Sequence, residues 1–276
     1  MADRISFLNT SFDRMTPDEA VELLLARLLM RQSGRVYYAN AHTMVTASKN
    51  PELVDALNQT DLLLADGSGV RWGSALLGQP LVYNLNGTDL VPALCNAGAE
   101  RGLSVYLLGG KPGVAEEAAA NLAKAYPGLV IAGTRDGYFS EEETAQVLKD
   151  IRTARPHILL VAMGVPLQEI WINRYSSQLP GITCMGVGGL FDFLAQRVRR
   201  APGFIRAMGM EWSWRLAMEP SRMWKRYLVG NVVFFSLVAA HALSSRQTAQ
   251  LEKTAAYEYE AADGSVSANF PLSRTA

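Results

Sequence analysis

The chain has 276 residues, of which 49% are apolar and 19% charged, and these proportions fit a globular protein with a substantial core. Its formal net charge is zero, which argues against a protein that binds nucleic acid over its whole surface. The two cysteines and three histidines are too scattered to predict a disulfide framework or a zinc site. No long apolar segment stands near the start, so we expect no signal peptide and a protein that stays in the cytoplasm.

The first predicted helix begins at Thr16 and ends at Gly34. Its start, Thr16-Pro17-Asp18-Glu19, combines a capping box with proline at the first helical position. Apolar strands and helical segments then alternate, and a second capping box at 140–143 starts a later helix. The six predicted strands lie at 36–39, 62–65, 104–108, 129–132, 157–162 and 182–187. This alternation predicts an α/β fold in which helices cover both faces of a parallel sheet.

The stretch 40–70 carries the strongest single signal. Asp66 and Gly67 follow directly after the second predicted strand. Open α/β sheets bind ligands at the carboxyl ends of their strands, and a glycine permits the sharp turn that would leave Asp66 projecting toward a ligand. The alternative is an aspartate that only caps the helix predicted at 68–77. Position alone leaves both interpretations open.

Polar and glycine residues follow the next strands as well. Asn86 and Asp89 lie in a turn-rich loop from which they could reach a ligand hydroxyl, and Thr88 is expected to cap the helix at 89–102. Gly109 opens a glycine-rich turn between a strand and a helix. This turn matches neither the Walker pattern nor G-x-G-x-x-G, and it fits either a phosphate cradle or a simple tight turn.

The composition changes at residue 197. Between 197 and 226, eight basic residues face two acidic ones, so this segment carries +6 and the rest of the chain −6. Three tryptophans are interleaved, and the apolar run 228–243 that follows is shorter than the about 20 residues of a spanning helix. This combination predicts an element that lies on an anionic membrane surface. The alternative is a core helix of an oligomer.

These features divide the chain into three parts. We expect a sheet domain at 1–196, a basic, aromatic and apolar C-terminal appendage at 197–243, and a disordered polar tail at 244–276.

Several motifs occur in a defined order. They are Asn40 with Asp66-Gly67, then Gly87-Thr88-Asp89, the segment GVPLQEIW at 164–171, the segment GVGGLFD at 186–192, and EW, RL and EP within 211–222. Together they resemble the WecG/TagA/CpsF family of bacterial glycosyltransferases over roughly residues 36–227. The agreement of several spaced motifs makes the resemblance specific.

The resemblance implies a single Rossmann-like domain, of the type classed as GT-E, with a membrane-associating C-terminal appendage. It implies an inverting, metal-independent enzyme without a cofactor. This enzyme would transfer a hexose-type sugar (N-acetylmannosamine, its uronic acid or glucose) from a UDP-sugar to a polyprenyl-diphosphate-linked saccharide during surface polysaccharide synthesis. Its partners would be donor, acceptor and an anionic membrane, on whose cytoplasmic face it would be peripheral.

The resemblance assigns the general base, and the chemistry of the remaining residues suggests the rest of the site. Asp66 would be the general base that takes the proton of the acceptor hydroxyl. Position 68 is serine, so there is no D-x-D at this step, and arginines would offset the charge of the departing diphosphate. The expected catalytic residues are Asp66, Arg215 and Arg222. The expected substrate-binding residues are Asn40, Thr43, Asn86, Asp89, Gly109, Gln168, Asp192 and Arg226.

At two positions the chain departs from the family. A threonine is common two residues before the motif asparagine, and here it is Tyr38, although Thr43 lies close in sequence. An arginine is common three residues before the glycine of the second motif, and here it is Asn84. Loss of that cation favours a neutral donor sugar over a uronate.

Two other classes of protein stay open. A nucleotide-dependent oxidoreductase fits the alternating pattern but lacks the G-x-G-x-x-G fingerprint, and NAD binding would support it. A non-catalytic membrane scaffold would use only the C-terminal segment, and it would bind lipid without binding UDP.

Overall fold

The structure, a computed structural model, describes residues 3–244 and 247, with the side chain of Arg222 excepted. It opens with an antiparallel hairpin, β1 (Asp3–Phe7) and β2 (Thr10–Arg14), which the sequence reasoning does not predict. Apart from residues 244 and 247, the tail predicted to be disordered lies outside the described residues.

A six-stranded sheet follows, in the order β4-β3-β8-β7-β5-β6, and every adjacent pair is parallel. The strands are β3 (Gly34–Ala39), β4 (Leu62–Ala65), β5 (Ser104–Gly109), β6 (Val130–Arg135), β7 (Ile158–Ala162) and β8 (Thr183–Gly186). The predicted strands and the α/β class are therefore confirmed. Ala39 pairs with Ala65, so β3 and β4 end level with each other and the residues after them start side by side.

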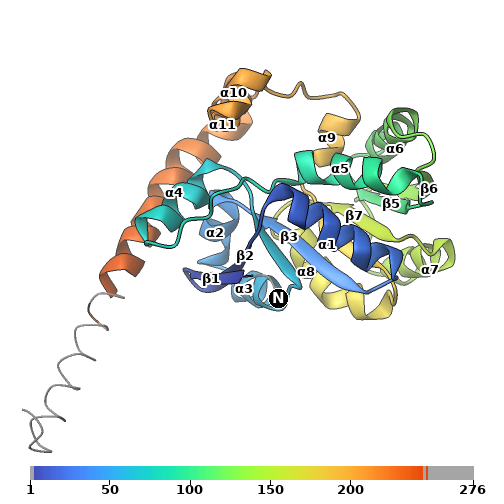
Figure 1. The fold of residues 1–276 in the computed structure, drawn as a ribbon, viewed down its shortest axis with the longest axis horizontal. Coiled ribbons are helices and arrows are strands. Elements are labelled where there is room, and N and C mark those ends of the chain that lie inside the picture. Colours follow the sequence, from blue (N-terminus) through green and yellow to red (C-terminus); the bar gives the residue numbers. More distant parts are fainter. Residues whose placement is uncertain (1–2, 245–246, 248–276) are drawn as a thin grey trace, which may run out of the picture.

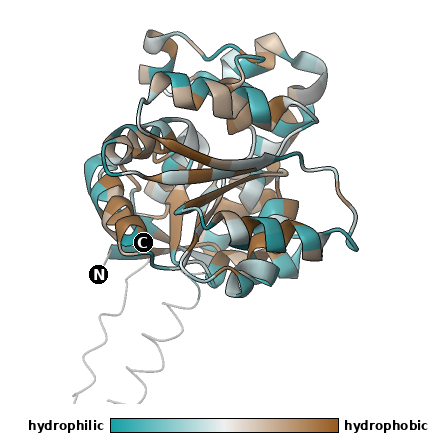
Figure 2. Ribbon diagram, turned by 90° about the vertical axis from the view of Figure 1, so that its right-hand side faces the viewer, coloured by the Kyte–Doolittle hydropathy of each residue, from teal (hydrophilic) through white to brown (hydrophobic). Residues whose placement is uncertain are grey.

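Helices cover both faces of this sheet, as predicted (Figure 1). On one face the core is built with α1 (Pro17–Leu29), α5 (Gly87–Ala99), α6 (Val114–Ala125) and α9 (Leu190–Leu194). On the other it is built with α2 (Ala41–Ala47), α3 (Pro51–Asn58), α4 (Ser68–Leu76), α7 (Thr144–Ala154) and α8 (Leu167–Tyr175). Figure 2 shows the apolar strands lying between these helical layers.

The segments that leave neighbouring strands β3 and β8 turn to opposite faces. After β3 the chain enters α2, whose buried residues join one core cluster, and after β8 it enters α9, whose buried residues join the other. Such a divergence at the carboxyl edge is where open α/β sheets bind ligands.

The helix α1 has the predicted capping box but ends earlier than predicted. Thr16 and Glu19 exchange hydrogen bonds as expected. The last helical residue is Leu29, and Arg31 has a φ of 53°, a left-handed conformation that ends the helix. Gly34 begins β3 instead of ending the helix.

Two other helix starts differ from prediction. Asn86, not Thr88, caps α5, because its extended backbone lets Oδ1 accept the Asp89 N–H at 2.9 Å. The α7 helix begins at Thr144 rather than at Ser140, since residues 141–143 form a turn.

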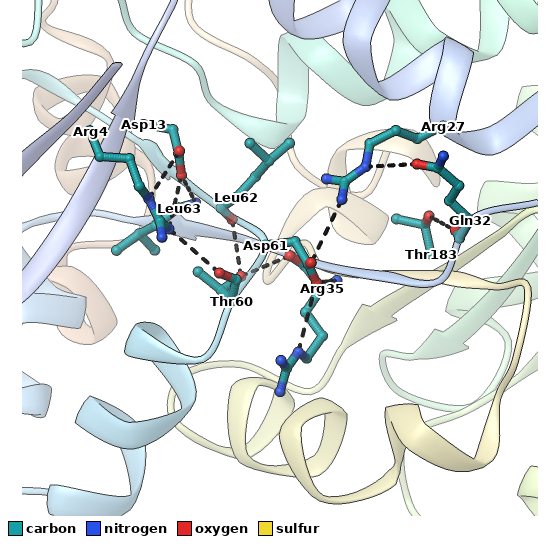
Figure 3. Close-up of polar contacts among 10 residues, drawn as sticks. All are labelled: Arg4, Asp13, Arg27, Gln32, Arg35, Thr60, Asp61, Leu62, Leu63 and Thr183. Atoms are coloured by element: carbon teal, nitrogen blue, oxygen red, sulfur yellow. Dashed lines mark hydrogen bonds and ion pairs between the residues drawn. The ribbon is translucent and has the colours of Figure 1, made fainter. Parts of the chain in front are cut away.

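Polar contacts fasten the hairpin to β4 (Figure 3). The buried Asp13 accepts the N–H of Leu63 at 2.8 Å and pairs with Arg4 at 3.1 Å. Burial raises the pKa of Asp13, although the contacts with Leu63 and Arg4 oppose this. The hairpin thus extends the core next to the edge strand that precedes Asp66.

The chain after α9 forms α10 (Gly203–Ala207), α11 (Glu211–Met218), α12 (Pro220–Trp224) and a C-terminal helix (Lys225–Ser244). By length and composition alone this last helix could cross a membrane. Figure 1 shows it beside α4. Phe234 and Val238 are buried on it, and the Phe234 ring lies 6.1 Å from that of Phe7 in the hairpin. The appendage therefore packs against the sheet domain.

Candidate active site

Asp66 and Asn40 face each other at the carboxyl edge of the sheet. Asn40 Nδ2 donates to Asp66 Oδ2 at 3.1 Å, while Asn40 Oδ1 accepts the N–H of Thr43 and caps α2. Asp66 does not cap the helix after it, because the cap position is Gly67 and no side chain bonds there. One carboxylate oxygen is thus held, and Oδ1 of Asp66 has no hydrogen-bond partner among the described residues.

The loop after α4 returns to this point. Gly67 donates its N–H to Asn84 Oδ1 at 2.6 Å, and Leu85 donates its N–H to the carbonyl of Ala65 at 2.8 Å. Gly67 has a φ of 89°, a left-handed conformation that favours glycine. Asn84, the residue in place of the family arginine, therefore lies at the Asp66-Gly67 turn.

Two buried residues lie beneath the Asn40–Asp66 pair. Thr43 is fully buried, and its Oγ1 accepts the N–H of Asn40 at 3.3 Å, so it supports the asparagine. Tyr38 packs its ring against Gly87, and its buried hydroxyl has no hydrogen-bond partner among the described residues. Burial, and then the Asp66 charge, raise the pKa of Tyr38, so its hydroxyl stays protonated.

Gln168 joins the loops that follow β7 and β8. Its Oε1 accepts the N–H of Gly164 at 3.2 Å and of Gly188 at 3.0 Å. Its Nε2 donates to Glu169 Oε1 at 2.7 Å, and the residue is almost completely buried. In this structure Gln168 fixes two loops at the carboxyl edge.

Glu169 lies behind Gln168 and is fully buried. Burial raises its pKa to about 7, although the Gln168 hydrogen bond opposes the shift. Its Oε2 has no hydrogen-bond partner among the described residues. A carboxyl in such a place is an acid that changes charge near neutral pH.

Asp89 is paired with the appendage. Arg200 Nη1 lies 2.7 Å from Asp89 Oδ1, Arg206 lies 3.8 Å away, and Asn86 Nδ2 donates to Asp89 at 2.8 Å. Partial burial raises the pKa of Asp89, but the bonds from Arg200 and Asn86 outweigh it and the pKa is lowered. Both predicted ligand residues, Asn86 and Asp89, are thus occupied by α5 capping and by ion pairs.

Gly109 lies where the backbones of β5 and β7 meet. Its φ is 134°, and a Cβ there would be 2.5 Å from the carbonyl oxygen of Ala162. The tight-turn interpretation accounts for this glycine, and a ligand role stays a prediction.

The appendage brings Arg215 to the same edge of the sheet. Its guanidinium lies over the Phe193 ring at 5.3 Å, and Nη2 would be 3.6 Å from a Cβ added at Gly189. Its buried Nε has no hydrogen-bond partner among the described residues. Half-buried Asp192 lies in the first turn of α9 in the same segment. Arg215, Gly189 and Gln168 therefore converge on the loop after β8.

The other predicted arginines are placed less directly. Arg226 lies 5.9 Å from the Tyr227 ring, and its charge contributes to lowering the pKa of His42 to about 4, after the larger effect of burial. Arg222 is in α12, and its side chain lies outside the described residues. Among the other basic residues of the appendage, Arg197 pairs with Glu117 at 2.8 Å and Arg200 pairs with Asp89. Some of the basic residues that give the appendage its charge of +6 therefore fasten it to the sheet domain.

Three residues at this edge have no site assignment from the sequence: Tyr38, Asn84 and Glu169. The first two were visible as departures from the family pattern. Glu169 lies in the motif segment 164–171, where a charged residue directly before Ile170 and Trp171 and shortly after a buried strand is a detectable signal.

Within 3–244 and 247, no group of three or more His, Cys, Asp or Glu side chains is arranged to hold a metal ion. Metal independence stays a prediction.

The parallel sheet, the divergence after β3 and β8 and the polar residues gathered there define a Rossmann-like α/β protein with its site at the carboxyl edge. The chain matches the glycosyl transferase WecG/TagA/CpsF family over residues 5–248 and belongs to that family. It is 34% identical over 190 residues to the N-acetylglucosaminyldiphosphoundecaprenol N-acetyl-beta-D-mannosaminyltransferase of Bacillus spizizenii, covering 69% of this chain and 73% of that protein. The protein is thus a hexosyltransferase of polysaccharide biosynthesis.

Proposed function

We propose that this enzyme transfers N-acetylmannosamine from a UDP-sugar to a polyprenyl-diphosphate-linked N-acetylglucosamine, with inversion and without a metal ion. The observation that carries the proposal is the 34% identity with a relative named for that transfer, together with the Asn40–Asp66 pair at the edge where the family motifs meet. A neutral sugar also fits Asn84, which is not a cation.

Asp66 acts as the general base. Asn40 holds Oδ2, and Oδ1 accepts the proton of the acceptor hydroxyl as its oxygen attacks the anomeric carbon of the donor. The bond from that carbon to the UDP oxygen breaks as the new glycosidic bond forms, and UDP leaves from the opposite side. A single displacement of this kind inverts the anomeric configuration.

Arginines offset the charge that develops on the departing diphosphate. The position of Arg215 over Phe193 and beside Gly189 supports this role. Its buried Nε, which has no hydrogen-bond partner among the described residues, could donate to the diphosphate. Arg222 and Arg226 are proposed to assist it from the same appendage. Gln168 orders the neighbouring loops through Gly164 and Gly188. Asp192, in the first turn of α9 after β8, is proposed to contact the uridine or ribose.

We further propose that the protein is peripheral on the cytoplasmic face of the membrane, held by its appendage. Support comes from the basic, tryptophan-rich segment 197–226 and from the exposed apolar residues Leu228, Val229 and Val232 of the C-terminal helix. Because Phe234 and Val238 of this helix pack on the sheet domain, a helix lying on the surface is favoured over one that spans.

The test is mass-spectrometric detection of UDP and glycolipid product with a panel of donors. The acceptor is a short-chain polyprenyl-diphosphate N-acetylglucosamine, and the donors are the UDP derivatives of N-acetylmannosamine, N-acetylmannosaminuronic acid and glucose. We expect product from the first donor. Product from the uronate or glucose donor alone would overturn the sugar assignment, and NAD binding without any UDP release would overturn the reaction.

A further inference from the structure

The helix α4 exposes large apolar side chains on the face that points away from the core. Val70, Gly73 and Ser74 are buried against the core, as the 3.6-residue period requires for an inward face. The outward face carries Trp72, 51% exposed, and Leu76, 68% exposed, where a water-facing helix would carry charged or polar residues.

The loop after α4 exposes two more large apolar residues. Val82 is 56% and Tyr83 44% exposed, although the loop is ordered by Ser74 Oγ, which accepts the N–H of Leu81 at 3.0 Å. Several large apolar side chains exposed within one short segment indicate a contact surface.

The charge of this segment indicates which partner covers it. Between Asp66 and Asp89 the only charged residue is Arg71, a cation, and Trp72 and Tyr83 are the residue types that gather at membrane interfaces. A segment without acidic residues avoids repulsion from anionic lipid headgroups.

The segment is also continuous with the proposed membrane element. At Gly73 an added Cβ would be 3.0 Å from Phe234 Cζ, so α4 and the C-terminal helix touch with no room for a side chain between them. Gly209, between α10 and α11, would place a Cβ 3.7 Å from that of Ser68 at the start of α4. The appendage therefore borders α4 along its length, as Figure 1 also shows.

We infer that α4 and its following loop (68–84) form a second membrane-contact element, contributed by the sheet domain, which seats the Asp66 end of the sheet on an anionic lipid bilayer. The inference rests on the proposed membrane association. Asp66 and Gly67 lie directly before α4, and Asn84 ties the far end of the loop back to Gly67. Contact of this segment with lipid therefore brings the proposed general base to the bilayer surface, where a lipid-diphosphate acceptor has its head group.

A fluorescent label tests the contact directly. The variants Leu76→Cys and Met30→Cys place a thiol at two similarly exposed positions, and Met30, at the end of α1, lies away from α4. Cys95 and Cys184 are fully buried, so a nitrobenzoxadiazole maleimide labels the introduced thiols selectively. With vesicles of phosphatidylglycerol and phosphatidylcholine, the label at 76 should shift to the blue and brighten severalfold, and the label at 30 should not change.

A second measurement separates this inference from the membrane proposal. Co-sedimentation of the unlabelled protein with the same vesicles tests membrane association, and Leu76→Glu should weaken it about tenfold, the loss expected when one leucine is no longer buried in lipid. Met30→Glu is the matched control, and turnover of a soluble acceptor should stay unchanged in both.

Each contrary outcome has a distinct meaning. Sedimentation without a spectral change at 76 leaves the appendage as the membrane anchor and overturns the role of α4. Absence of sedimentation overturns both membrane proposals. A change at 76 that follows protein concentration without vesicles shows that a second copy covers α4, which also overturns the inference.

Discussion

Asn40 and Asp66 are 26 positions apart in the chain, yet Asn40 Nδ2 reaches Asp66 Oδ2 at 3.1 Å because β3 and β4 pair in register up to the residues before them. This contact joins the ends of two strands and sets the direction of the carboxylate. The proposed proton transfer depends on this contact, and substitutions can separate the role of the base from the role of the residue that orients it.

Asp66→Asn removes the proposed base while keeping the side-chain size. A positioned base contributes a factor of about 10² to 10⁴, so we expect turnover to fall by that amount with UDP affinity nearly unchanged. Turnover is followed by UDP release and affinity by calorimetry. A loss of less than threefold in turnover would mean that Asp66 is not the base.

Asn40→Ser and Asn40→Asp test the orientation of that base. Serine and aspartate both cap helices well, so α2 should stay intact and the melting temperature of each variant should change little. Serine is too short to reach Asp66 and should lower kcat moderately. Aspartate places a second negative charge beside the base, so the two carboxylates share a proton and kcat should fall further than in the serine variant. The lost kcat should recover as the pH rises and both carboxylates ionise. Equal pH profiles for the two variants would contradict this role.

Arg215→Ala tests charge compensation apart from membrane binding. With a soluble short-chain acceptor we expect turnover to fall about 10²-fold, the usual effect of removing one transition-state donor. Arg215→Lys keeps the charge but lacks the paired N–H donors of the guanidinium, so it should retain only part of the activity. We expect a similar loss for Arg222→Ala, whereas Leu228→Glu should impair vesicle binding alone. Arginine variants that lose only vesicle binding would identify these residues as lipid anchors.

Glu169→Gln tests the buried carboxyl. Because burial raises the pKa of Glu169 to about 7, the folded protein keeps a proton that an ordinary glutamate loses near 4.5, so its contribution to stability falls as the pH rises between these values. Glutamine does not ionise. As the pH rises from 5 to 8, the melting temperature of the variant should therefore rise relative to that of the wild type. This change corresponds to at most roughly 3 kcal/mol in the free energy of unfolding. A constant difference over this range would show that Glu169 does not titrate there.

Chelation tests the metal question. The chain has no D-x-D at the Asp66 step, and its arginines are proposed to take the place of a cation. We expect full turnover after dialysis against EDTA. Recovery of a lost activity on addition of Mg²⁺ or Mn²⁺ would contradict the arginine role.

The sheet could be predicted from the sequence because most of its strands contain apolar runs that are followed by glycine or polar residues. The run Leu62–Ala65 followed by Asp66 is an example, since a strand buried on both faces leaves a strong local pattern. The hairpin could not be predicted, because Asp13 is stabilised by the N–H of Leu63, a contact between residues 50 positions apart.

The site was predicted in part. Sequence position indicates that Asp66 and Asn40 share an edge, but it does not show that Thr43 is buried beneath Asn40 or that Asp89 is held by Arg200. The pairing of Asp89 depends on how the appendage docks, and the packing of Phe234 against Phe7 likewise has no local signature. The sequence pattern suggests the basic residues of the appendage as lipid ligands. Two of them, Arg197 and Arg200, form ion pairs within the protein instead.

The contact between Phe7 and Phe234 joins the hairpin of β1 and β2 to the C-terminal helix. During synthesis on the ribosome, Phe7 emerges long before its aromatic partner Phe234. Phe12 can cover part of Phe7 early, but the surface that Phe234 covers stays exposed to water until the C-terminal helix is made. A nascent chain therefore completes this part of its core late, and a product that stops before Phe234 would lack the contact.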